Sequence, residues 1–155
     1  MSAEQNLADL KLQLPPAPEA MGLYRPVIVV DDLAYLSGHG PLQSDGSFIC
    51  GRVGADLDTE AGYQAARQTG LAVLATLRAA CGSLDRVQRL VKTFGLVQAT
   101  AEFADHPAVI NGFSELMRDV FGKEAGIAAR SAVGAASLPA GWAVEIETVF
   151  KLRQD

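Results

Sequence analysis

Apolar residues along this chain recur with two different periods, and the changes between them outline the elements of a fold. Two long segments, 59–80 and 104–121, repeat apolar residues at helical spacing and end at Gly82 and Gly122. A shorter amphipathic segment, 3–13, runs into a proline-rich stretch that favours an extended chain. Runs typical of strands cover 26–30, 33–38, 47–50, 86–98, 128–134 and 142–152. After the short helix, the predicted order is therefore β-β-β-α-β-α-β-β.

Strands at both ends of this order, with two long helices between them, predict an α+β sandwich with both helices on one face of the sheet. The sequence offers no third long helix, so the other face of the sheet has no cover within the chain. Apolar residues fill both faces of the second half of 86–98, which predicts burial on both sides of that strand. We therefore expect the chain to associate with copies of itself.

Length and charge narrow the classes of partner. The 155 residues suit one domain, expected over 21–155 after an N-terminal helix and proline-rich linker over 1–20. With 13 basic and 18 acidic side chains the net charge is −5, which disfavours binding to the phosphate backbone of nucleic acids. Neither a secretory signal nor a run of about 18 apolar residues is present, so we expect a cytoplasmic protein without a membrane span.

Cysteines and histidines are too scattered to suggest a metal centre. Cys50 and Cys81 stand alone, as free thiols of a reduced cytosol would. His39 and His106 have no other ligand-type residues close by in sequence. No metal and no cofactor is therefore expected.

The last predicted strand carries two carboxylates on one face. Strand alternation places Glu145, Glu147 and Val149 together, with Val144, Ile146, Thr148 and Phe150 on the opposite face. The two carboxylates would then lie roughly 6.5–7 Å apart along the strand. Because the apolar set would pack beneath the helices, the glutamates point to the uncovered face. They could bind a ligand there, form ion pairs with another subunit, or remain in solvent.

Arg130 is the single charged residue in the otherwise uncharged run 126–135. A guanidinium in such a setting needs a partner, and its planar fork suits bidentate binding of a carboxylate. The partner could be a small anionic ligand or a glutamate of the last strand, if the two final strands pair. His39, between Gly38 and Gly40, could act as an acid or base, although a histidine in a turn is usually exposed. Ser37 and Ser131 lack the surroundings of an activated nucleophile.

Several motifs together resemble the RidA/YjgF family, also called the L-PSP endoribonuclease family. They are Tyr24 after its preceding Ala-Pro-Glu-Ala-Met-Gly-Leu, Tyr-Leu-Ser-Gly-His-Gly-Pro at 35–41, Gly-Ser-Leu-Asp-Arg-Val at 82–87, Val-Ile-Asn-Gly-Phe at 109–113, and Ala-Arg-Ser-Ala-Val followed by Leu-Pro and Val-Glu-Ile-Glu. The resemblance covers about 15–151 and leaves the N-terminal helix as an addition.

The resemblance implies a chorismate-mutase-like fold, a homotrimer, and a ligand cleft at each subunit interface. In members that deaminate, the residue matching Arg130 clamps the substrate carboxylate, and the one matching Glu145 positions the water that attacks a 2-imino acid. The expected products are a 2-oxo acid and ammonia. Residues expected to line the cleft are Tyr24, Gly38, His39, Asn111 and Ala132.

Three positions depart from the pattern of active deaminases and indicate a divergent subgroup. Gly134 stands where a glutamate is frequent, Ala132 where a cysteine is common, and His39 where glutamine is usual. Three activities therefore remain as hypotheses: an enamine/imine deaminase, a non-catalytic trimer that binds small carboxylates, and an endoribonuclease. The acidic charge and the lack of a basic stripe count against the last.

Overall fold

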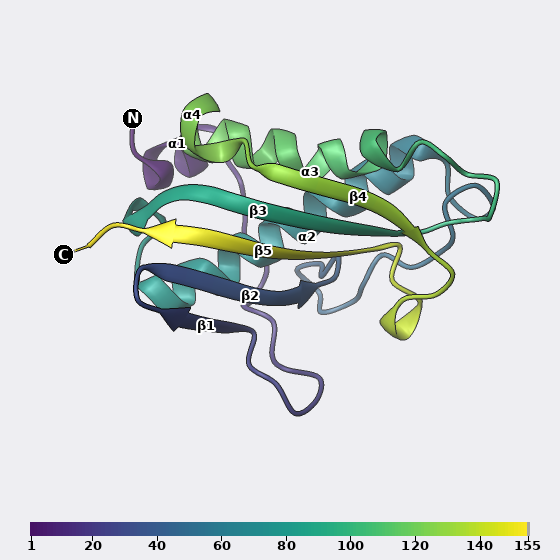
Figure 1. The fold of residues 1–155 in the computed structure, drawn as a ribbon, viewed down its shortest axis with the longest axis horizontal. Coiled ribbons are helices and arrows are strands. Elements are labelled where there is room, and N and C mark those ends of the chain that lie inside the picture. The colour runs from purple at the N-terminus through teal and green to yellow at the C-terminus, as the bar shows by residue number, and fades with distance from the viewer. Residues whose placement is uncertain (155) are drawn as a thin grey trace.

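In the computed structural model, which describes residues 1–154, two helices pack on one face of a five-stranded mixed sheet (Figure 1). The strand order is β1-β2-β5-β3-β4, with β3 and β4 parallel and every other pair antiparallel. The strands are β1 (Val27–Val30), β2 (Leu33–His39), β3 (Val87–Gln98), β4 (Ala129–Ala135) and β5 (Val144–Leu152). The helices are α1 (Ala3–Asp9), α2 (Thr59–Cys81), α3 (His106–Phe121) and α4 (Lys123–Gly126), with short 3₁₀ turns at Leu84–Arg86 and Pro139–Gly141. The predicted α+β sandwich is confirmed.

The two final strands are not neighbours. The connection from β3 through α3 to β4 is a parallel crossover, which places β4 at the edge of the sheet beside β3. β5 pairs with β3 from the other side. The expectation that Arg130 in β4 and the glutamates of β5 lie on paired strands is therefore wrong, because β3 separates them.

The boundaries of α2 follow from its capping residues. The Asp58 side chain accepts a hydrogen bond from the backbone N–H of Ala61, and Gly82 closes the helix with φ +79° in the left-handed region. α1 is shorter than predicted and ends at Asp9. Leu7 of α1 nevertheless lies in the main hydrophobic core, and Glu4 pairs with Arg78 of α2 at 2.9 Å. The expected boundary at residues 20 and 21 falls in the extended segment before β1 and stays a prediction.

The expected third strand at 47–50 does not form. Phe48 bridges to Leu42, whereas Cys50 bridges to Trp142, so neighbouring residues pair with different parts of the chain. Gly46 and Gly51, both with positive φ, bend the backbone at either end of the segment. Four residues between two such bends are too few for a ladder, and the segment becomes a loop wall instead.

The main core lies between the sheet and α2 and α3. Val144, Ile146 and Phe150 of β5 are fully buried, as strand alternation predicted. The two helices approach so closely at Gly112 that a Cβ there would meet the backbone carbonyl of Tyr63. Other fully buried side chains in this layer are Leu74, Leu77, Ile110, Phe113, Leu116 and Met117.

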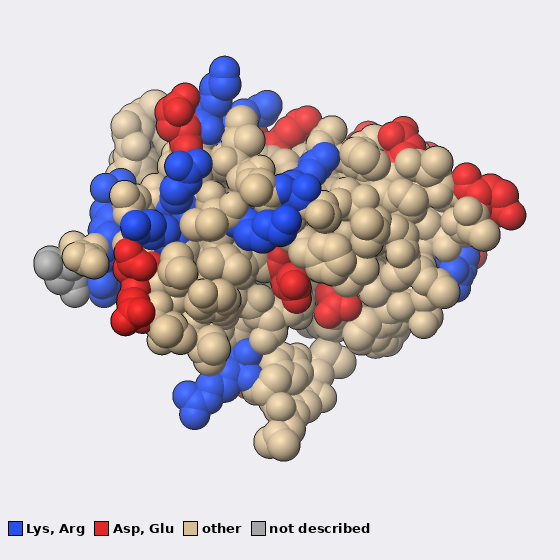
Figure 2. All heavy atoms as spheres, viewed as in Figure 1, with Lys and Arg blue, Asp and Glu red and all other residues tan. Residues whose placement is uncertain are grey.

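The opposite face of the sheet is open and largely apolar. Cross-strand register places Ile28, Tyr35 and Val149 side by side, and Ile28 and Tyr35 are 48% and 42% exposed. Phe94 and Leu96 of β3 are only partly buried on this face, so the predicted burial on both sides is not reached within one chain. Figure 2 shows that basic side chains gather at one end of this face among acidic ones, while much of the remainder is uncharged.

Candidate functional site

Glu145 lies on the open face of β5, where its carboxylate rests against the backbone of β2. A Cβ at Gly38 would fall on Glu145 Oε1, so only glycine leaves room for this side chain. Among residues 1–154 the carboxylate accepts no hydrogen bond and forms no ion pair. Burial raises the pKa of Glu145, and the nearby charge of Glu147 raises it further. Glu145 is thus a carboxylate of increased basicity with free acceptor sites.

A hollow of about 420 Å³ surrounds Glu145. Tyr24 enters it from the turn before β1, and its hydroxyl accepts a hydrogen bond from the backbone N–H of Met21 at 3.0 Å. The remaining wall is formed by Met21, Ser37, Gly38, Pro139 and Trp142. The structure therefore brings together three of the predicted site residues, namely Glu145, Gly38 and Tyr24.

His39 is buried, with 4% of its surface exposed, so the expectation of an exposed turn histidine is wrong. It is the last residue of β2, and a register irregularity between Leu36 and His39 turns its ring towards α2. Nδ1 lies 2.6 Å from the carbonyl oxygen of Ser37, and Nε2 lies 2.8 Å from Thr76 Oγ1. Because a carbonyl only accepts, Nδ1 carries the proton and Thr76 donates to Nε2. Burial lowers the pKa of His39, which keeps the ring neutral.

Arg130 projects to the opposite side of the sheet, towards α3. Its Nη1 donates to Asn111 Oδ1 at 2.8 Å and to Ser114 Oγ at 3.1 Å. Burial lowers the pKa of the guanidinium, which stays charged because an arginine titrates far above neutral pH. Thr93 is opposite Arg130 in β3, and its buried hydroxyl has no hydrogen-bond partner among residues 1–154.

A hollow of about 320 Å³ lies beside this arginine, between α3 and the edge of the sheet. Its polar lining includes Arg130, Asn111, Ser114, Thr93, Glu115 and Arg118. Nε and Nη2 of Arg130 donate to no acceptor within residues 1–154, so one edge of the guanidinium fork is available to a ligand. A carboxylate fits such an edge with two parallel hydrogen bonds.

The predicted site thus falls into two halves on opposite faces of the sheet. The Glu145 half contains Tyr24 and Gly38 on the open face, and the Arg130 half contains Asn111 on the helix side. β3 lies between the two strands that carry Arg130 and Glu145. A molecule as small as a 2-imino acid cannot contact both residues within one chain.

Two positions that differ from the pattern of active deaminases, Ala132 and Gly134, lie in β4, and the space beside Gly134 is filled by a residue of α3. Ala132 lies opposite Gly95 and packs against the core, next to Arg130 on the same face of β4. A Cβ at Gly134 would lie only 2.6 Å from His106 Nε2. His106 therefore occupies the space that a side chain at position 134 would need.

Sequence reasoning missed several residues of both halves. Ser114 holds Arg130 together with Asn111, and its position three residues later on α3 was an available signal. Met21, Phe48 and Trp142 shape the cavity next to Glu145, and nothing in their spacing indicated this. Within residues 1–154 no group of three or more histidine, cysteine or acidic side chains is placed to hold a metal ion. No helix in that range is both long and apolar enough to cross a bilayer.

The mixed sheet with two helices on one face, together with the two half-sites, defines an α+β protein of the chorismate-mutase-like class. The family described as "YjgF/chorismate mutase-like, putative endoribonuclease" matches residues 4–144, so the match includes most of α1. The chain belongs to this family.

Individual relatives support the assignment over nearly the whole chain. The protein TCP17 of Trypanosoma cruzi is 38% identical over 147 residues, which cover 95% of this chain and 92% of TCP17. A solved structure from Agrobacterium tumefaciens, described as of unknown function, is 35% identical with a TM-score of 0.88, covering 97% of this chain and 94% of its own. A structure from Shewanella oneidensis, provisionally described as an endoribonuclease, is 29% identical with a TM-score of 0.93, covering 98% and 100%.

Proposed function

We propose that the protein is a homotrimeric hydrolase that converts 2-imino acids to 2-oxo acids and ammonia at clefts between subunits. The reaction is R–C(=NH₂⁺)–COO⁻ + H₂O → R–CO–COO⁻ + NH₄⁺. It needs an oriented electrophile, a placed water and a proton carrier, and the two half-sites offer groups for each.

The observation that carries this proposal is the half-buried carboxylate of Glu145, which has no hydrogen-bond or ion-pair partner in the part of the chain that the structure describes. A burial-raised pKa makes the ionised group a better base. Its oxygens can hold a water against C2 of the imine and take a proton from that water as the C–O bond forms. The carboxylic acid then returns the proton to the nitrogen, and the C–N bond breaks to release ammonia. As the hydroxyl of the intermediate becomes the carbonyl, the Glu145 carboxylate takes its proton and passes it to the departing ammonia, which leaves as NH₄⁺.

Arg130 supplies the second requirement, orientation of the substrate. Asn111 and Ser114 accept hydrogen bonds from Nη1 of the guanidinium. These bonds fix the plane of the group, and with it the direction in which Nε and Nη2 donate. In the proposed site, the substrate carboxylate binds the free edge formed by Nε and Nη2, and Glu145 comes from a second subunit.

A shared site follows from the separation of the halves. Arg130 and Glu145 of one chain face opposite sides of the sheet, and the open face exposes Ile28, Tyr35 and other apolar side chains. Burial of that face against a second copy would remove apolar surface from water. In the proposed trimer, Glu145 of each chain faces Arg130 of the partner subunit, and three copies close the ring.

A non-catalytic trimer that binds small carboxylates is the second candidate. The observation that favours it is His106, which takes the space beside Gly134 where active deaminases frequently carry a glutamate. In this case Arg130 would still bind 2-oxo acids. An endoribonuclease, as the names of several relatives suggest, fits less well with the net charge of −5 and with the mixed charges of the face in Figure 2.

The test is to generate 2-imino acids in situ with a flavin-dependent amino-acid oxidase and to follow their loss in the presence of the protein. We expect faster imine loss with wild type and the uncatalysed rate with Arg130→Ala. Stabilisation by 2-oxo acids through Arg130 without turnover of any imine would favour the binding protein instead. RNA cleavage that co-purifies with the protein and is unaffected by Arg130→Ala would support the endoribonuclease hypothesis.

A further inference from the structure

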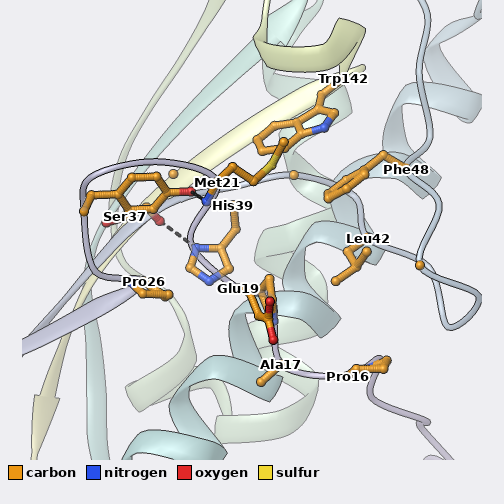
Figure 3. Close-up of a pocket in the computed structure, with 15 residues that line it drawn as sticks. Pro16, Ala17, Glu19, Met21, Pro26, Ser37, His39, Leu42, Phe48 and Trp142 are labelled. Atoms are coloured by element: carbon orange, nitrogen blue, oxygen red, sulfur yellow. Dashed lines mark hydrogen bonds between the residues drawn. The ribbon is translucent and has the colours of Figure 1, made fainter.

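A cavity of about 440 Å³ lies at the end of β2, beside the Glu145 hollow (Figure 3). Its lining is mostly apolar and comes from three separate parts of the chain. The residues used below are Pro16, Met21, Leu42, Phe48 and Trp142. Figure 3 shows Trp142, Phe48, Leu42 and Pro16 arranged around one side of the space, with His39 in the wall across from them and Met21 next to Trp142.

The cavity and the Glu145 hollow adjoin each other. Met21, Tyr24, Ser37, Gly38 and Trp142 line both of them. Glu145 lines only the hollow, whereas Leu42 and Phe48 line only the cavity, which forms the apolar end of the two adjoining spaces. A molecule whose reacting carbon is at Glu145 can extend into the apolar end.

Several contacts keep the apolar end open without a ligand. The rings of Phe48 and Trp142 stack with centroids 4.8 Å apart and an interplanar angle of 23°. The backbone of Gly40 lies directly under the indole, where a Cβ would come within 2.5 Å of the ring. Gln68 of α2 donates to the carbonyl of Leu42 at 2.6 Å, which fixes the loop after β2. These walls are therefore preformed, which lowers the cost of binding.

We propose that this cavity receives the side chain of the substrate, and that the preferred substrates are 2-imino acids with a large apolar side chain, aromatic or branched. The inference rests on the proposed function. In a 2-imino acid the carboxylate and the side chain leave C2 in different directions. With the carboxylate on Arg130 of the partner subunit and C2 at Glu145, the side chain points away from the arginine, into the cavity.

The size of the space selects the same substrates. The one-carbon side chain of 2-aminoacrylate would leave most of about 440 Å³ unfilled. A benzyl or isobutyl group would instead lose its contact with water against Leu42, Phe48 and Trp142. Burial of a side chain of that size favours binding by roughly 10- to 100-fold over a methyl group. His39, which burial keeps neutral, adds no charge to the lining, and among residues 1–154 Glu19 is its one charged side chain.

The experiment compares kcat/KM for imines generated from phenylalanine, leucine and alanine by an amino-acid oxidase. Isothermal calorimetry with phenylpyruvate and pyruvate forms the second arm. We expect wild type to prefer the phenylalanine-derived imine, and phenylpyruvate, by about 10-fold or more. Leu42→Trp places a larger ring in the cavity and should abolish the preference for the phenylalanine-derived imine and for phenylpyruvate. Leu10→Trp, at an exposed position at the end of α1, is the matched control and should behave as wild type.

Equal rates and equal affinities across the series would overturn the inference while leaving the proposed function intact. A preference that survives Leu42→Trp would overturn it as well. If no imine is turned over, the calorimetric arm still decides: tighter binding of phenylpyruvate that Leu42→Trp removes supports the cavity even though the hydrolase proposal fails. Absence of binding to either 2-oxo acid contradicts both.

Discussion

The free edge of the Arg130 guanidinium makes a quantitative prediction for ligand binding. Nη1 is committed to Asn111 and Ser114, whereas Nε and Nη2 have no acceptor within residues 1–154. A carboxylate on that edge accepts two charge-assisted hydrogen bonds, each worth about 1.5–3 kcal/mol. Because the site is only partly buried, we take the lower end, about 3 kcal/mol for the pair. At about 1.4 kcal/mol per tenfold change, Arg130→Ala should weaken binding of a 2-oxo acid by about 100-fold.

Two milder substitutions test the bidentate geometry of the Arg130 guanidinium and the contact that holds it in place. Arg130→Lys keeps a cation but loses the bidentate geometry, so we expect roughly a 10-fold loss. Asn111→Ala keeps both free donors and removes one of the two hydrogen bonds that hold Nη1, while the bond to Ser114 remains, so we expect only about a 5-fold loss.

Isothermal calorimetry with a 2-oxo acid measures all three variants, with its uncharged amide as the control ligand and circular dichroism as the check on folding. An unchanged dissociation constant for Arg130→Ala would refute the carboxylate clamp. Equal binding of the amide and the acid by wild type would do the same.

Four further predictions concern other parts of the structure. Glu145→Gln should lower imine turnover by about 10²- to 10⁴-fold with little change in 2-oxo acid affinity, and unchanged turnover would remove Glu145 from the mechanism. Wild-type activity should fall with decreasing pH, with a midpoint above the pKa of an ordinary glutamate. Tyr35→Asp, on the open face, should shift the mass measured by light scattering from trimer to monomer, and a monomeric wild type would contradict the shared cleft. Gly134→Glu should lower the melting temperature because it must displace His106, whereas Gly134→Glu combined with His106→Ala should recover part of the loss in thermal denaturation. The pKa of His39 is lower in the folded protein, so the unfolded chain binds a proton at this residue first as the pH falls. The free energy of unfolding should therefore decrease below about pH 6.5. His39→Gln should lessen this decrease, as measured by denaturant titrations from pH 7 to pH 5.

The helices and the alternation along β5 could be predicted because their causes are local. Asp58 and Gly82 cap α2 within a few residues of where the apolar stripe begins and ends. Val144, Ile146 and Phe150 needed only the two-residue period of a strand to be placed in the core. The same period also placed Glu145 on the open face.

Strand pairing was not local, and that is where the prediction went wrong. Adjacent position in sequence suggested that β4 and β5 form a hairpin, but the crossover through α3 sets β4 beside β3. The face of Arg130 was nevertheless encoded in the sequence, because Ala128 and Ala132, in phase with it, pack against the core. The burial of His39 depends on a register irregularity in β2, for which the sequence carried no evident signal.

The central claim is that one active site takes Glu145 from one subunit and Arg130 from the next. The most direct test mixes Arg130→Ala and Glu145→Gln chains in equal amounts, lets trimers reassemble, and measures imine turnover. Neither variant should be active alone, but averaged over all reassembled trimers about one quarter of the clefts would combine an intact Glu145 with an intact Arg130 from the neighbouring chain. Recovery of about one quarter of wild-type activity is the predicted result. Activity no greater than the sum of the two separate variants would contradict the shared site.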